Sequence, residues 1–219
     1  MAEAIAFHQI YYKEEQLPHL YPWAKPYFNP GLTIFFENDP IAKIVSETES
    51  EKVGVCSWRL AMKLRQRLRL TVPLEEAIFN MDYEILALTR QSSHHQMMAA
   101  AKEWHPGFMD TITMIWTKLG LRMPGETKTP IYQNHFIAKT SIYKRYVDEF
   151  LKPAMELTNR DEELNKLMTQ DSHYGKLSQG DMRSVKEKLG MDFYPMAPFV
   201  LERCPALFFT MLKIPVTYI

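Results

Sequence analysis

The chain has 219 residues and equal numbers of basic and acidic side chains, 26 of each, so its formal net charge is zero. This balance argues against a dedicated nucleic-acid-binding protein, because such domains usually carry a clear excess of positive charge. A hydrophobic fraction of 46% excludes a disordered chain and is enough for a buried core. We therefore expect residues 1–219 to form a single domain.

The N-terminal segment, MAEAIAFHQIYYKEEQ, lacks the basic region and apolar run of a signal peptide. No stretch of the sequence reaches the ~18 uninterrupted apolar residues of a membrane span. The chain has two cysteines, Cys56 and Cys204, which are too few for a disulfide framework. These features predict a cytoplasmic protein with no transmembrane segment, and they leave peripheral membrane contact and the oligomeric state open.

The first half of the sequence predicts buried strands separated by loops and short helices. Residues 17–30 contain four prolines, which favours an extended loop over a helix. Short apolar runs rich in β-branched or aromatic residues predict buried strands, and these runs lie at residues 32–36, 53–57 and 84–88. Pro40 suits the first turn of a short helix that ends near Val45.

The second half is predicted to be mainly helical, with helices at residues 92–104, 108–119, 141–157, 181–189 and 199–212. Ser92 or Ser93 is expected to cap the first of them. Pro153 and Pro205 are expected to kink or break two others. Residues 216–219 could form a closing strand. Strands interleaved with helices predict an α/β fold, in which helices flank a mixed sheet and dominate the C-terminal half.

Standard catalytic and nucleotide-binding motifs are absent from the sequence, including GxGxxG, the Walker motif, GxSxG, HExxH and CxxC. Their absence excludes most common nucleotide-binding, hydrolase and zinc-binding families. The pair His94–His95 does not predict a metal site, because adjacent helical residues point about 100° apart. We expect these two histidines to lie on the surface or at the start of a helix.

A basic segment follows the predicted strand at residues 53–57, where α/β proteins place their ligand sites. Residues 58–69 contain five positive charges and no negative charge. Arg59 and Lys63 are four residues apart, so on a helix they would share one face and suit a diphosphate. The alternative is a solvated basic surface that is balanced by nearby acids at Glu75, Glu76 and Asp82.

Two acidic spacings resemble metal–diphosphate sites. Glu37 and Asp39 follow the predicted strand at residues 32–36, and carboxylates at a strand end can share a divalent ion with a diphosphate. Asp82 and Glu84 have the same spacing, although Asp82 lies before its predicted strand rather than after it. Asp39 could instead cap the helix that Pro40 begins.

Two polar pairs lie within apolar runs, Asn134–His135 in IYQNHFIA and Glu202–Arg203 in APFVLERCPALFF. A charged pair in so apolar a segment must be paired internally or face a cleft, because a lone buried charge costs several kcal/mol. Both alternatives stay open for Glu202–Arg203: a salt bridge that fixes the last helix, or a catalytic role for Glu202.

Three segments carry a resemblance to a known family. Residues 29–63 include NPGLTIFFEN and VGVCSWRLAMK, residues 131–157 read IYQNHFIAKTSIYKRYVDEFLKPAMEL, and residues 194–209 read YPMAPFVLERCPALFF. In order and spacing they resemble the bacterial glycosyltransferase-like proteins of capsule and surface-polysaccharide loci. This sequence departs from the family pattern at Gly31, where the family has a glutamate, and it has no Asp-x-Asp motif.

The resemblance implies a GT-A-like fold and transfer of a sugar from a nucleotide-diphosphate sugar, the donor, to an acceptor hydroxyl. It carries donor-site roles to Trp58, Arg59, Asn134, His135 and Arg203, and it adds Glu202 as a catalytic carboxylate. Together with the residue patterns, it suggests Lys63 as a further donor contact and Asp82 as a second catalytic candidate. A divalent ion, Mn²⁺ or Mg²⁺, would be held by Glu37 and Asp39. The alternative is a degenerate, non-catalytic transferase-fold module that binds a glycan or a partner enzyme.

Overall fold

The computed structural model describes residues 4–67, 73–88, 94–125, 130–131, 133–174 and 182–219, apart from the side chains of residues 65–67 and 94–96. A six-stranded sheet forms within this part of the chain, in the order β2-β1-β3-β5-β4-β6. β5 is antiparallel to both of its neighbours, whereas the other pairs are parallel. The strands are β1 (Ile5–Tyr11), β2 (Lys25–Phe28), β3 (Lys52–Ser57), β4 (Ile85–Ala87), β5 (Phe136–Lys139) and β6 (Thr217–Tyr218).

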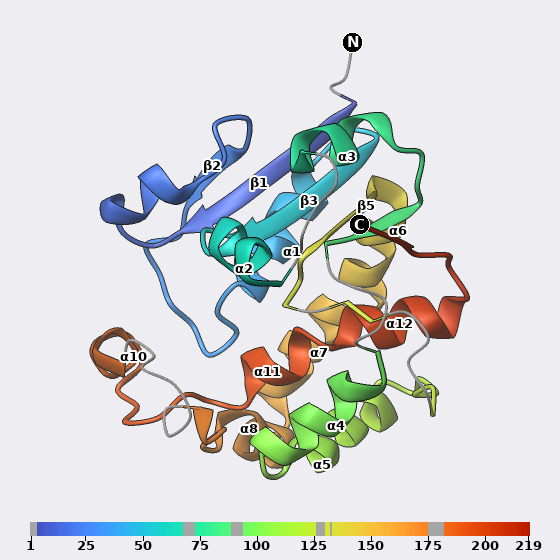
Figure 1. Ribbon diagram of the computed structural model, residues 1–219. Coiled ribbons are helices and arrows are strands. Elements are labelled where there is room, and N and C mark those ends of the chain that lie inside the picture. Colours follow the sequence, from blue (N-terminus) through green and yellow to red (C-terminus); the bar gives the residue numbers. More distant parts are fainter. Residues whose placement is uncertain (1–3, 68–72, 89–93, 126–129, 132, 175–181) are drawn as a thin grey trace.

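Helices cover both faces of the sheet, as Figure 1 shows, so the prediction of an α/β fold with a mixed, helix-flanked sheet is confirmed. Alternate side chains of a strand point to opposite faces. Val53 and Val55 therefore join the larger core, which includes residues of α1 (Asn38–Glu47) and α6 (Thr140–Tyr146). Cys56 joins a smaller core with residues of α2 (Leu60–Arg67) and α3 (Leu74–Asn80).

The C-terminal half adds a group of helices on the side of the molecule toward which β1 and β3 run (Figure 1). None of the helices in the described ranges is both long enough and apolar enough to span a membrane. The helices of this half are α4 (His94–Trp104), α5 (Phe108–Lys118), α7 (Lys152–Arg160), α8 (Glu162–Thr169), α10 (Met182–Leu189), α11 (Ala197–Leu201) and α12 (Cys204–Leu212).

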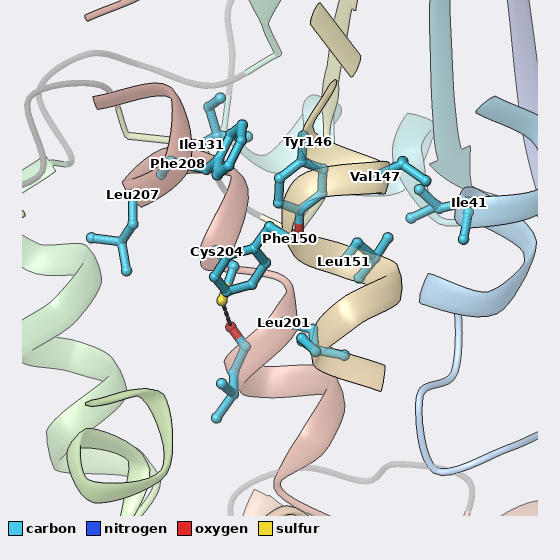
Figure 2. Packing of buried hydrophobic residues seen from close by; sticks show 14 of the residues in the cluster. Ile41, Ile131, Tyr146, Val147, Phe150, Leu151, Leu201, Cys204, Leu207 and Phe208 are labelled. Carbon is cyan, nitrogen blue, oxygen red and sulfur yellow. Dashed lines mark hydrogen bonds between the residues drawn. The ribbon is translucent and has the colours of Figure 1, made fainter. Parts of the chain in front are cut away.

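The helix predicted at residues 141–157 is confirmed, and it contains a wider π turn. α6 passes into η3 (Val147–Leu151), a π-helical segment, and then into α7. Pro153 lies in the first turn of α7. Proline has no N–H, and its ring crowds the carbonyl four residues earlier in an ordinary α-helix. The wider π turn before Pro153 accommodates the proline, where the sequence predicts a kink or a break. Figure 2 shows side chains of this helix packed against α12, and the rings of Phe150 and Phe208 are 6.1 Å apart.

The predicted C-terminal helix is divided into α11 and α12, and the division falls at Glu202 and Arg203 rather than at Pro205 itself. Pro205 lies in the first turn of α12, where the missing N–H costs nothing. The thiol of Cys204 donates a hydrogen bond to the Val200 carbonyl at 3.2 Å across this division (Figure 2). The two charged residues thus occupy the junction between the two helices, with Glu202 as the C-cap of α11 and Arg203 as the N-cap of α12.

The strand predicted at residues 32–36 is wrong, because this segment forms a turn. Phe36 has a φ of 55°, and its N–H bonds to the Thr33 carbonyl at 3.2 Å. The apolar side chains reflect packing, since Phe35 is buried in the larger core. The strand of this region is β2, which lies within residues 17–30, the segment expected to be a loop. Pro26 is tolerated there because β2 is an edge strand, with one partner strand in the described sheet.

Other elements follow the prediction closely. The strands expected at residues 53–57, 84–88 and 216–219 are confirmed as β3, β4 and β6. β1 and β5 were not predicted. The expected helices at residues 92–104, 108–119 and 181–189 correspond to α4, α5 and α10, whereas the proposed caps Ser92 and Ser93 and the first residue Asp181 lie outside the described residues.

Candidate functional site

A cavity of about 280 Å³ opens where β1 and β3 end. Tyr12 and Lys13 follow β1, and Ser57 closes β3; all three line the cavity. β2 lies on one side of β1 in the sheet, and β3, the next strand along the chain, lies on the other side of β1. The direction in which strands are added to the sheet therefore reverses between β1 and β3. Open α/β sheets bind ligands at this kind of switch point, beyond the carboxyl ends of the strands.

The antiparallel direction of β5 brings a further pair of polar residues to the same sheet edge. Gly54 of β3 pairs with Ile137 of β5, so the start of β5 lies beside the end of β3. Gln133 and Asn134 precede β5, have φ values of 57° and 56°, and line the cavity. The Gln133 Oε1 atom is buried and has no hydrogen-bond partner in the described structure. A buried polar atom without a partner is costly unless a ligand or water satisfies it.

Basic side chains exceed acidic ones along the described cavity wall. Arg59 precedes α2 and Lys63 lies in its first turn, and both face the cavity. The guanidinium carbon of Arg59 lies 5.1 Å from the centroid of the Trp58 ring, a cation–π contact that helps hold it in place. Five basic residues line the wall against two acidic ones, namely Lys13, Arg59, Lys63, Lys188 and Arg203 against Glu37 and Glu202. In a chain of zero net charge, this local excess favours an anionic ligand.

Glu37, at the start of α1, is one of the two cavity carboxylates. Burial raises the pKa of its carboxyl, and the nearby charge of Glu202 adds to that rise. The charges of Lys63 and Arg59 and a hydrogen bond with Ser57 oppose the rise without cancelling it. Glu37 is therefore a carboxyl group that holds a proton more readily than an ordinary glutamate.

Glu202 and Arg203 form an ion pair that also lines the cavity. Arg203 Nη1 donates to Glu202 Oε1 and also to the Phe199 carbonyl, the latter at 2.6 Å. Arg203 is 6% exposed, and its Nε atom is buried without a partner in the described structure. The pair is therefore an internal salt bridge that also forms part of the cavity wall, and the catalytic role of Glu202 stays a prediction.

His105, which the sequence analysis did not single out, lines the same cavity. It directly follows α4 and is only 2% exposed. Its Nδ1 atom lies 2.8 Å from the Ser172 carbonyl oxygen, and its ring stacks on Phe199 with centroids 4.3 Å apart. The signal that could have found it is weak: a histidine at the end of a predicted helix, just before the Pro106–Gly107 stop.

Three predicted site residues lie away from the cavity wall. Asp39 lies in the first turn of α1 and accepts a hydrogen bond from the Thr33 hydroxyl. It does not cap that helix, because the N-cap position is Glu37. Asp82 is exposed between α3 and β4. His135 is 4% exposed and directly precedes β5. The rest of the predicted set, Glu37, Trp58, Arg59, Lys63, Asn134, Glu202 and Arg203, lines the one cavity.

Of the two residues predicted to hold a divalent ion, Glu37 lines the cavity and Asp39 does not, and their metal-binding role stays a prediction. Asp39 is bound to Thr33 outside the cavity, and Glu37 lies among basic side chains. In the part of the chain that is described, no three His, Cys, Asp or Glu side chains are grouped so that they could hold a metal. The side chains of Arg65 and Arg67, and the whole of Arg69, fall in the undescribed part.

The cavity thus offers cations for an anionic group, two carboxyl groups in different environments and one buried imidazole. Such a set can bind a charged ligand, stabilise a negatively charged leaving group and move a proton. Comparisons with known proteins do not extend this description, because no family model matches the chain and no curated protein or solved structure matches it either.

Proposed function

We propose that the protein is a GT-A-like glycosyltransferase, which passes a sugar from a nucleotide-diphosphate sugar to an acceptor hydroxyl in bacterial surface-glycan synthesis. The observation that carries the proposal is the convergence of Arg59 and Lys63 with Glu37 and Glu202 on a single cavity at the switch point of the sheet. All three segments of the family resemblance contribute to this wall, through Trp58–Arg59, Asn134 and Glu202–Arg203.

The donor diphosphate would bind at Arg59 and Lys63. A guanidinium offers paired donors to phosphate oxygens, and an ammonium group adds a compact positive charge. When the bond between the sugar and the diphosphate breaks, negative charge grows on the diphosphate oxygen. Preorganised cations stabilise that charge without having to reorganise, which is the largest contribution a transferase site can make.

The sugar would lie beside Gln133, Asn134 and Trp58. Sugars present many hydroxyl groups, and the unpartnered Oε1 atom of Gln133 is an acceptor suited to one of them. An indole ring suits the less polar face of a sugar. Glu202 remains a candidate for assisting proton transfer at the acceptor, and its ion pair with Arg203 holds the carboxylate in position.

Calorimetric titration with UDP- and GDP-sugars, with and without Mn²⁺, tests the donor site, and a CMP-sugar, which has a single phosphate, serves as the comparison. We expect one donor class to bind, and Arg59→Ala and Lys63→Ala each to weaken its affinity at least ~10-fold, the loss typical of a charge-assisted contact. Lys43→Ala, on the exposed face of α1, is the matched control and should bind normally. If no donor binds the native protein, the proposal fails.

A second candidate function is a non-catalytic module that binds a nucleotide sugar, a glycan or a partner enzyme. The observation that favours it is the pairing of Glu202 with Arg203, since a carboxylate oxygen engaged by a guanidinium is not free to contact an acceptor hydroxyl. The test measures release of the nucleotide product over a range of acceptors and pH values. A protein that binds the donor but never releases this product would favour the module over the transferase.

A further inference from the structure

The position of His105 is fixed by its surroundings. The ring is held between the Ser172 carbonyl, which is 2.8 Å from Nδ1, and the stacked ring of Phe199. A third ring, that of Tyr174, lies 6.4 Å away. Phe199 and Tyr174 also line the cavity, so the imidazole is fixed by residues of the site itself.

The contact with Ser172 determines which ring nitrogen carries the proton. A carbonyl oxygen can only accept a hydrogen bond, so Nδ1 of His105 must be the donor. In the neutral imidazole the lone pair is then on Nε2. The bond to Ser172 is the only hydrogen bond of the His105 ring in the described structure, so Nε2 has no protein partner there, and His105 itself lines the cavity.

Burial and the surrounding groups act on the pKa of His105 in opposite directions, and burial is the largest effect. Burial lowers the pKa of the imidazole, as do the charges of Arg203 and His173. The Ser172 carbonyl and the Glu202 carboxylate oppose that shift. These two acceptors would stabilise the imidazolium that forms when a proton arrives at Nε2.

We propose that His105 Nε2 is the general base that removes the proton from the acceptor hydroxyl. The inference rests on the proposed transferase function. As the acceptor oxygen forms its bond to the anomeric carbon, the hydroxyl proton moves to Nε2. The bond from the anomeric carbon to the diphosphate breaks, and its electron pair stays on the diphosphate beside Arg59 and Lys63. Glu202 acts as a positioning residue that stabilises the imidazolium.

The test measures donor binding and donor turnover separately in His105→Asn, using the donor found by calorimetry and water as the acceptor. Asn keeps a donor near the Ser172 carbonyl but has no basic ring nitrogen. We expect affinity to stay within ~3-fold and release of the nucleoside diphosphate to fall at least ~100-fold, the usual range for loss of a general base. His173→Asn is the matched control, because His173 is partly exposed and does not line the cavity.

The pH profile and chemical rescue distinguish a base from a structural histidine. Turnover by the native protein should rise with pH to a plateau as His105 loses its proton, and this rise should be absent in His105→Asn. Added imidazole should partly restore turnover in His105→Ala. An unchanged rate and pH profile in His105→Asn, with donor still bound and turned over, would overturn this inference alone. A native protein that neither binds nor turns over a donor overturns the proposed function as well.

The tautomer can be checked in the native protein without any variant. Nitrogen NMR of the histidine rings should show Nδ1 of His105 protonated and Nε2 unprotonated in the neutral ring. The opposite tautomer would overturn the proposal, because Nε2 would then have no lone pair to accept a proton.

Discussion

The carboxyl group of Glu37 lines the cavity, and its pKa depends on the balance between burial and the neighbouring cations. Burial raises the pKa of this carboxyl above its ordinary value despite Lys63 and Arg59. The folded protein therefore holds the Glu37 proton more strongly than the unfolded chain. Above the ordinary pKa of a glutamate, the folded state is increasingly penalised by the ionised group.

We expect Glu37→Gln to be more stable than the native protein at pH 8, since the amide carries no charge to bury. The gain should shrink as the pH falls and disappear at about pH 4, where the carboxyl is protonated in both states. Urea denaturation at the two pH values measures the difference. Glu47→Gln, on the exposed end of α1, is measured alongside as the matched substitution, and a larger gain for Glu37→Gln at pH 4 than at pH 8 would contradict the explanation.

At the scale of elements, the division between α11 and α12 lets a charged pair face the cavity inside an otherwise apolar segment. Arg203 bonds the carbonyl of Phe199 near the end of α11 and the carboxylate of Glu202. The side chains of Arg203 and Glu202 are 7% and 21% exposed, so water screens the charges of this pair only in part.

Arg203→Met should therefore destabilise the protein by about 3 kcal/mol, because it leaves a largely buried carboxylate without its partner. The same change at Arg145, whose pair with Glu149 is exposed on α6 and η3, should cost about 1 kcal/mol or less. Chemical denaturation of both variants gives the comparison. Equal losses at the two positions would show that the Glu202–Arg203 pair is effectively solvated.

The elements that could be predicted from the sequence are those with a strong local signal. The apolar run of β3 and the helical periodicity from Ile142 to Leu157 led to correct predictions. The run at residues 32–36 has the composition of a strand, but its backbone turns at Phe36 while Phe35 packs into the core. β5 has four residues, and its antiparallel direction is set by pairing with β3 and β4 rather than by its own sequence.

The candidate site was predicted best at residues that have a suitable side chain and also lie in one of the three segments of the family resemblance. Arg59, Asn134 and Glu202 come from three distant segments, and the fold brings them to one cavity. Asp39 and Asp82 were chosen by acidic spacing, which does not determine where a side chain points. His105 was not predicted because its position is fixed by the Ser172 carbonyl, a partner 67 residues away in the chain.

At the scale of the whole molecule, a neutral chain concentrates basic groups around one cavity. Arg59 and Lys63 can supply the positive charge that a diphosphate requires. Of the two acidic residues predicted to hold a metal, Glu37 lines this cavity and Asp39 does not.

Removal of divalent ions with EDTA should therefore leave the affinity for the donor within ~2-fold, because side-chain cations neutralise the diphosphate. Titration calorimetry with EDTA and with added Mn²⁺ measures this directly. Arg59→Ala serves as the comparison, since it should weaken binding under both conditions. A strict requirement for Mn²⁺ in the native protein would show that the diphosphate is held through a metal.

The two outer strands of the sheet bear on how the protein behaves when it is concentrated. β2 contains Pro26, which cannot donate a backbone hydrogen bond, and β6 is two residues long. An exposed strand edge invites pairing with a second chain and growth into aggregates, whereas a proline or a very short strand interrupts that pairing. The described sheet thus ends on each side in a strand that is a poor template for another chain, and we expect strand exchange between molecules to be disfavoured.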